Sequence, residues 1–114
     1  MELLAVYGTL KKDSYNHGIL SRSGAEYVAT TVTTNKYTMY DGGFPRVVVG
    51  DDSQIHIEVY KIDTFQPTDR LEGHPHFYRR ELVPVEGFKE HVWMYICQHI
   101  EPGPIIHNGL WPSK

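Results

Sequence analysis

The stretch Ile55-His56-Ile57-Glu58-Val59-Tyr60-Lys61-Ile62 alternates between apolar and polar side chains. Because successive residues of a β-strand point to opposite faces, this pattern predicts a strand that places Ile55, Ile57 and Val59 on one face. The chain is therefore expected to be built around a β-sheet.

Short strands are also predicted on both sides of this stretch, where β-branched and aromatic residues gather between turn signals. They cover residues 3–7, 26–34, 37–40 and 44–49, followed by an antiparallel pair over residues 78–85 and 92–99. Two short helices are predicted as well. The first spans residues 15–20 after the potential N-cap Ser14, and the second spans residues 67–71, beginning at Pro67 and ending before Gly73.

Many short strands with few helices predict an α+β fold, a small β-barrel-like domain of mostly antiparallel strands with one or two short helices at its rim. The length suits one domain over residues 1–114. Its tail, from about residue 101 to 114, holds three prolines and two glycines, which predicts an irregular coil.

The overall composition excludes several classes of protein. A net charge of -3 without a basic cluster argues against a nucleic-acid partner. No run approaches the roughly 20 apolar residues that cross a bilayer, so no membrane partner is expected. The first residues lack a basic leader, and the one cysteine, Cys97, fits a reducing compartment. We therefore expect a cytoplasmic protein.

Three segments stand in series along the chain: Tyr7-Gly8-Thr9-Leu10-Lys11, then Val59-Tyr60-Lys61-Ile62-Asp63, then Asp69-Arg70-Leu71-Glu72-Gly73-His74-Pro75 followed by Phe77-Tyr78-Arg79-Arg80. In this order and spacing they resemble the gamma-glutamylcyclotransferase-like family, which includes the gamma-glutamylamine cyclotransferases and the plant avirulence-induced relatives. Asn16-His17, Gly43-Phe44-Pro45 and Trp93-Met94-Tyr95 also sit where that family has similar residues. The resemblance covers about residues 3–97.

The resemblance implies a reaction on a small γ-glutamyl substrate. The substrate's α-amine attacks its own γ-carbonyl, 5-oxoproline forms, and an amine or amino acid leaves. The nucleophile is already part of the substrate, so holding the chain folded back supplies a large effective concentration. One group must carry a proton and another must stabilise the oxyanion. Neither task needs a cofactor, and none is expected.

Glu72 matches the acidic residue that carries the proton in this family. It stands at the end of the second predicted helix, between Leu71 and Gly73, where partial burial would raise the pKa of its carboxyl. Taken from the residues alone, a solvated glutamate at a helix end is the alternative reading.

The family places the substrate against the loop that matches Tyr7, Gly8, Thr9 and Leu10. A turn after a strand exposes successive backbone N–H groups, which can bind a carboxylate. Tyr78 is predicted to contact the substrate with Tyr7. The alternatives are an ordinary turn for the loop, and core aromatics with hydrogen-bonded hydroxyls for the two tyrosines.

Other polar residues are assigned structural roles. Arg80 is predicted to pair with a carboxylate and hold its strand. His74 and His76 flank a proline and lack a zinc-like set of further ligands, so no metal site is expected. Cys97 lies in an apolar segment and is read as a buried hydrophobe. Ile57 departs from the family, which often has glycine there, and is expected to narrow or reshape the pocket.

Two functions of different classes fit these observations. The first is an enzyme that cyclises γ-glutamyl compounds. The second is a binding module that keeps the cradle for a carboxylate metabolite without turning it over. Glu72 within its motif favours the enzyme, because a pure binder has little use for a buried acid.

The expected chemistry needs no metal ion, because the substrate supplies the nucleophile and a carboxyl group carries the proton. Release of 5-oxoproline should therefore proceed at the same rate with and without a chelator. Loss of turnover on chelation, restored by adding a divalent ion, would contradict this expectation.

Overall fold

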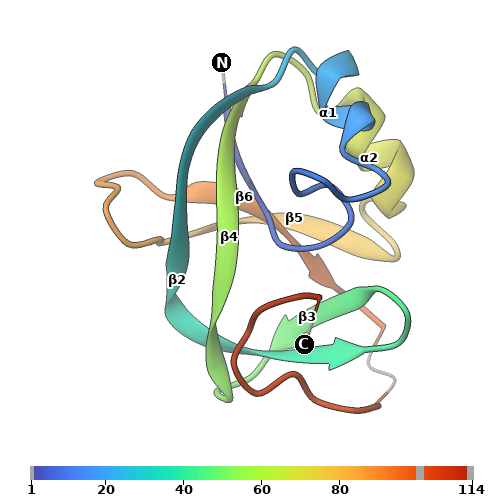
Figure 1. Ribbon diagram of the computed structural model, residues 1–114, viewed down its shortest axis with the longest axis vertical. Coiled ribbons are helices and arrows are strands. Elements are labelled where there is room, and N and C mark those ends of the chain that lie inside the picture. The colour runs from blue at the N-terminus through green and yellow to red at the C-terminus, as the bar shows by residue number, and fades with distance from the viewer. Residues whose placement is uncertain (1, 100–101, 113–114) are drawn as a thin grey trace.

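The computed structural model describes residues 2–99 and 102–112. Six strands form one curved sheet in the order β3-β2-β4-β1-β6-β5, and two short helices lie together at one end of it (Figure 1). Neighbouring strands are antiparallel except for β1 and β6. The bounds are β1 Glu2–Val6, α1 Gly18–Arg22, β2 Glu26–Asp41, β3 Pro45–Val49, β4 Ser53–Ile62, α2 Gln66–Glu72, β5 Tyr78–Val83 and β6 Val92–Cys97.

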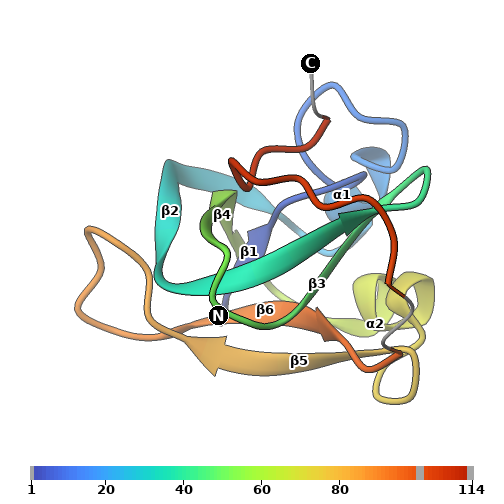
Figure 2. The same ribbon diagram turned by 90° about the horizontal axis from the view of Figure 1, so that it is seen from below.

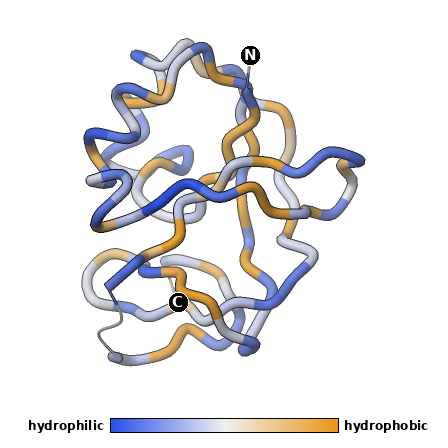
Figure 3. The backbone as a smooth tube through the Cα atoms, turned by 180° about the vertical axis from the view of Figure 1, so that it is seen from behind, coloured by the Kyte–Doolittle hydropathy of each residue, from blue (hydrophilic) through white to orange (hydrophobic). Residues whose placement is uncertain are grey.

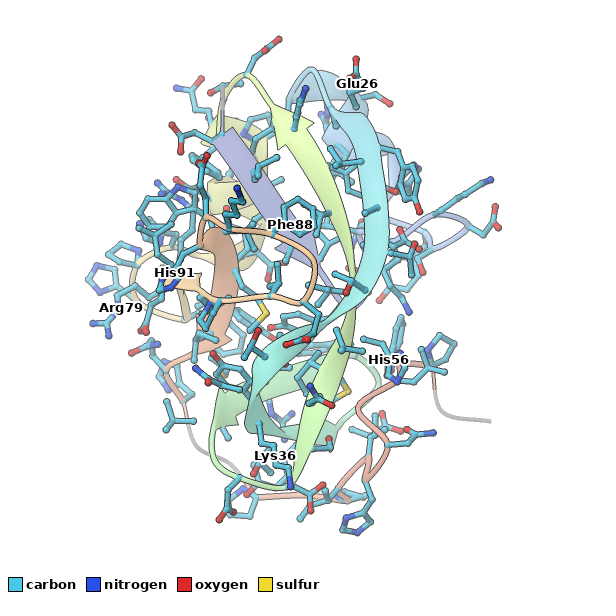
Figure 4. The ribbon with its side chains drawn as sticks, turned by 90° about the vertical axis from the view of Figure 1, so that its left-hand side faces the viewer. Glu26, Lys36, His56, Arg79, Phe88 and His91 are labelled. Carbon is cyan, nitrogen blue, oxygen red and sulfur yellow. The ribbon has the colours of Figure 1, made fainter. Side chains whose placement is uncertain are left out.

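Strand β4 lies near the middle of the sheet and pairs with β2 on one side and β1 on the other. Its alternation is as predicted: Ile55, Ile57 and Val59 are buried, whereas His56 is exposed and points away from the sheet (Figure 4). Tyr60 is buried too, but against a different set of residues on the opposite face. The strand is therefore covered on both faces over its second half.

Two apolar clusters account for this double burial. One fills the concave side and joins Ile57 and Val59 to Met39 and Met94. The other lies between the sheet and the helices and contains Leu4, Val6, Leu10, Leu20, Tyr60, Ile62 and Tyr95. Because β1 and β6 contribute to both clusters, they read as nearly continuous apolar runs, whereas the loops are mostly hydrophilic (Figure 3).

The predicted α+β class is confirmed, although closure of the barrel is not detected. No ladder joins the edge strands β3 and β5 within the described residues. The β5–β6 hairpin and the β2–β3 hairpin face each other across the interior (Figure 2). They are joined at an isolated bridge between Thr33 and Val85, supported by a 3.0 Å hydrogen bond from the Thr34 N–H to the Pro84 carbonyl.

Two predicted elements differ from the structure. The strands predicted over 26–34 and 37–40 form one strand, β2, whose pairing with β4 shifts register between Val32 and Lys36. The first helix begins at Gly18, so Ser14 does not cap it. The preceding residues form turns instead, because the Asn16 N–H and side-chain amide bind the Thr9 carbonyl and hydroxyl, each at 3.0 Å.

Residues 102–112 form no helix or strand, and most of them are exposed, with Ile106 and Gly109 buried. Ile106 is buried, and its N–H donates to the Met39 carbonyl at 2.8 Å. Residues 101, 113 and 114 of the predicted tail lie outside the described residues. Neither α1 nor α2 is long or apolar enough to cross a bilayer, and the described residues contain no other helix.

The central position of Ile57 gives a test of this core. Ile57 is 1% exposed, so Ile57→Ala should lower the free energy of unfolding by about 2–5 kcal/mol, the usual cost of truncating a buried aliphatic side chain. Val49, which is 81% exposed, is the control, and Val49→Ala should cost less than about 0.5 kcal/mol. Urea denaturation measures both, and equal shifts would contradict the assignment of the core.

Candidate active site

Glu72 is the last residue of α2, and the chain turns sharply directly after it. Gly73 adopts a left-handed conformation with a φ of 64°, which glycine reaches without steric cost. The His74 N–H then closes the helix end by donating to the Asp69 carbonyl at 3.0 Å. This ending confirms the predicted stop at Gly73.

The six predicted site residues come from three parts of the chain and line one open cavity with an empty volume of about 380 Å³. They are Tyr7, Gly8, Thr9, Leu10, Glu72 and Tyr78. The loop that follows β1 lies between the helices on one side and the β2–β3 hairpin on the other (Figure 1). This arrangement brings the N-terminal turn to the end of α2.

The Glu72 carboxyl group is partly buried in the wall of this cavity. Burial raises its pKa to about 7. No described residue donates a hydrogen bond to it, so nothing offsets the cost of removing its charge from water. Near neutral pH the group is therefore present in both protonation states, which suits a residue that takes up and returns a proton.

The Tyr7 and Tyr78 hydroxyl groups are hydrogen-bonded within the protein. Tyr7 donates to the Tyr95 carbonyl at 2.6 Å, and Tyr78 donates to the Pro45 carbonyl at 3.0 Å. Burial raises the pKa of both hydroxyls, so each keeps its proton. The tyrosines are thus buried aromatics with bonded hydroxyls that also line the cavity, and they can accept but not readily donate a further hydrogen bond.

The turn after β1 lines the cavity and has two backbone N–H groups without an acceptor among the described residues. The Thr9 carbonyl accepts from the Asn16 N–H, and the Leu10 carbonyl accepts from Nδ1 of His17 at 2.8 Å. The N–H groups of Thr9 and Leu10 donate to no acceptor among the described residues. The loop is therefore held by its carbonyls, and its N–H groups can receive an anion.

Gly8 is required by the packing of this loop. A Cβ atom at position 8 would lie 2.6 Å from Cγ of Pro45, a distance that real contacts do not reach. The glycine therefore lets the loop after β1 approach the β2–β3 hairpin, which brings both walls of the cavity together.

Arg80 has the structural role predicted for it. Its guanidinium group donates to both oxygens of Asp69, at 2.7 and 3.0 Å, and lies 3.9 Å from the ring centre of Phe65. Burial would raise the pKa of the Asp69 carboxyl, but hydrogen bonds from Arg80 and Tyr95 outweigh it and hold this pKa below its usual value. The ion pair fastens α2 to β5.

The cavity also contains residues to which the sequence analysis assigned no role: Ala5, Val6, Phe44, Pro45 and Tyr95. Phe44, Pro45 and Tyr95 belong to segments that carried the family resemblance, so that resemblance could have pointed to them. One expectation is wrong, because Ile57 lies in the apolar core and lines neither this cavity nor the one beside it.

The remaining candidates have structural surroundings. Nδ1 of His74 accepts a hydrogen bond from the Arg80 N–H at 3.1 Å, and its ring packs edge-on against Tyr95. Cys97 is buried in the apolar cluster between the sheet and the helices, as predicted. Over the described residues no group of three or more histidine, cysteine or acidic side chains is placed to hold a metal ion.

A family model described as "Gamma-glutamyl cyclotransferase, AIG2-like" matches residues 4–113. The chain belongs to this family. It is 37% identical over 115 residues to a candidate gamma-glutamylcyclotransferase of Methanocaldococcus jannaschii, covering 96% of this chain and 94% of the relative. A second candidate, from Vibrio cholerae, is 35% identical over 116 residues, covering 98% and 96%.

Solved structures agree with the fold of this family member. The crystal structure of a mouse AIG2-like protein superposes with a TM-score of 0.81 at 22% identity, over 90% of this chain and 80% of that one. At this identity the likeness concerns the fold alone.

The raised pKa of Glu72 predicts a specific dependence of stability on pH. Between about pH 4.5 and 7 the folded protein keeps a proton that the unfolded chain has lost, so the free energy of unfolding falls as pH rises. Glutamine does not titrate. Glu72→Gln should therefore gain stability relative to wild type between pH 4.5 and 8, by no more than about 3 kcal/mol.

Denaturant unfolding at the two pH values measures this gain. The exposed Glu90, in the β5–β6 loop, offers the matched control Glu90→Gln, which should differ from wild type equally at both. A difference for Glu72→Gln that does not change with pH would contradict the burial of this carboxyl.

Proposed function

We propose that this protein cyclises γ-glutamyl compounds, releasing 5-oxoproline and a free amine or amino acid. One observation carries the proposal: a carboxyl group with a pKa of about 7 shares a cavity with backbone N–H groups that lack partners among the described residues. Membership of the gamma-glutamyl cyclotransferase family supports the same reaction.

The cavity suggests how the glutamyl group is held. Its α-carboxylate is received by the N–H groups of Thr9 and Leu10, since neither lysine nor arginine is among the residues that line the cavity. Its α-ammonium group then lies on the side of Glu72, the acidic residue of the lining. Two opposite charges of the substrate are thereby matched by two different features of the protein.

The reaction needs two protons to move from the attacking nitrogen atom of the substrate to the leaving one. The Glu72 carboxylate takes a proton from the α-ammonium group, and the freed nitrogen attacks the γ-carbonyl carbon to form the ring bond. As the bond from this carbon to the leaving nitrogen breaks, Glu72 returns the proton to that nitrogen. Glu72 then takes the second proton from the ring nitrogen and passes it to the departed amine, so the attacking nitrogen loses two protons and the leaving amine ends as an ammonium ion.

The two tyrosines contribute shape to this mechanism. Their hydroxyl protons are engaged by the Tyr95 and Pro45 carbonyls, and their raised pKa values keep them from acting as bases near neutral pH. They form rigid walls that hold the substrate folded back, which brings its amine to its own carbonyl.

Replacing Glu72 tests the proposal directly. Glu72→Gln should reduce the release of 5-oxoproline by roughly 10²–10⁴-fold, the usual contribution of general acid–base catalysis. In wild type, kcat/KM should rise with pH through about 7, because the reaction begins with the carboxylate form. The assay uses a panel of γ-glutamyl amines and dipeptides with chromatographic detection of 5-oxoproline.

Glu90→Gln is again the control and should retain full activity. An unchanged rate in Glu72→Gln would show that another group carries the proton. A wild-type protein that binds members of the panel but releases no 5-oxoproline would instead support the non-catalytic binding module.

A further inference from the structure

A second cavity opens beside the first and shares part of its wall. It has an empty volume of about 500 Å³, and four of its lining residues belong to both cavities: Thr9, Phe44, Glu72 and Tyr78. The two spaces therefore meet at Glu72. A substrate whose reacting amide lies at Glu72 has one space for its glutamyl part and another for the rest.

The second cavity is lined mainly by aromatic and aliphatic side chains that are open to solvent. Its additional residues are Tyr15, Asn16, Leu71 and Phe77. Tyr15 is 75% exposed, and Phe44, Leu71 and Phe77 are each 38% exposed. These four come from four separate segments of the chain, so their gathering at one mouth is a product of the fold. An apolar surface of this kind beside a polar site is typical of ligand binding.

The charges of this cavity are equally informative. Among the described residues that line it, Glu72 is the one carboxylate, and none is a lysine or arginine. A carboxylate on the leaving group would find no cation there and would face Glu72. A cationic tail would have to compete for Glu72 with the substrate's own α-ammonium group.

We infer that the second cavity binds the leaving part of the substrate and selects amines that carry an uncharged aromatic or branched apolar group. This inference rests on the proposed function for the identity of the reacting bond. Tyr15, Phe44, Leu71 and Phe77 are then the residues that determine specificity, and they act by covering the apolar group of the departing amine.

The walls are fixed well enough to select by shape. The Phe77 ring packs edge-on against Tyr78 at 5.0 Å, and its backbone is held by hydrogen bonds to Gly73 and from Gln98 at 2.9 and 2.8 Å. The Phe44 carbonyl accepts from the Gly42 N–H at 3.3 Å within the β2–β3 turn. An apolar group entering the cavity thus meets surfaces that are already in place, which reduces the entropy cost of binding it.

The test uses ligands that bind without reacting. N-substituted glutaramic acids keep the carboxylate and the amide but lack the α-amine, so they have no nucleophile. Calorimetry compares the N-phenethyl, N-ethyl and N-carboxypentyl compounds. We expect the phenethyl compound to bind roughly tenfold more tightly than the other two, the lower end of what an apolar pocket gains from an added group.

Two variants test the residues themselves. Phe77→Ala should remove most of the preference for the phenethyl over the ethyl compound. If this variant fails to fold, Tyr15→Ala, in an exposed loop, should reduce the same preference. Leu82→Ala is the matched control, because Leu82 is an exposed apolar residue of β5 outside both cavities, and it should keep the full preference.

Equal affinity for all three compounds, or tightest binding of the carboxypentyl compound, would overturn the inference. So would a change of oligomeric state in Phe77→Ala by light scattering, which would make this surface an interface between copies of the chain.

The corresponding γ-glutamyl amides separate the two proposals. A preference in binding without any release of 5-oxoproline would reject the proposed reaction while retaining the selective cavity. Turnover of the phenethyl and ethyl amides with equal kcat/KM would support the proposed reaction but reject the selective cavity.

Discussion

The Asp69 carboxylate is the group on which the geometry of the site depends. It accepts hydrogen bonds from the Arg80 guanidinium group of β5 and from the Tyr95 hydroxyl of β6, so it fastens α2 to the last two strands. A helix of seven residues is not stable by itself, and its position has to come from contacts of this kind. Glu72 follows three residues later, about one helical turn away. The ion pair therefore decides where Glu72 lies.

Two carboxyl groups on one short helix are thus treated in opposite ways. Asp69 is surrounded by donors, and the pKa of its carboxyl is held below its usual value. Glu72 has no donor among the described residues, and burial raises the pKa of its carboxyl to about 7. The first arrangement stabilises the fold at neutral pH and the second opposes it. Environments that shift the pKa values of two nearby carboxyl groups in opposite directions are typical of sites where one group has a structural role and the other takes part in the chemistry.

The sequence predicted the strands well where alternation or a continuous apolar run was strong, as in β1 and β4. It failed where distant contacts decide local structure. The union of two predicted strands into β2 depends on pairing with β4, and the late start of α1 depends on hydrogen bonds between Asn16 and Thr9. The sequence did not show that Ile57 lies in the apolar core and not at the cavity, because the pairing and curvature of the sheet decide what each face of β4 contacts. The six residues of the candidate site were predicted from the family motifs, and they line one cavity. The aromatic surface beside them was not predicted, although Phe44, Leu71 and Phe77 lie in the motif segments, because only the folded chain shows that these side chains and Tyr15 line one cavity.

The close approach of Gly8 to Pro45 has a consequence for how this protein can change. Pro45 follows Phe44, and its carbonyl anchors the Tyr78 hydroxyl. A larger residue at position 8 would act as a wedge that displaces the β2–β3 turn, moving the aromatic wall and the tyrosine anchor together. The loop after β1 and the β2–β3 turn are in direct contact, so a displacement of one displaces the other. A side chain at position 8 is therefore compatible with this cavity only if position 45 carries a smaller residue than proline.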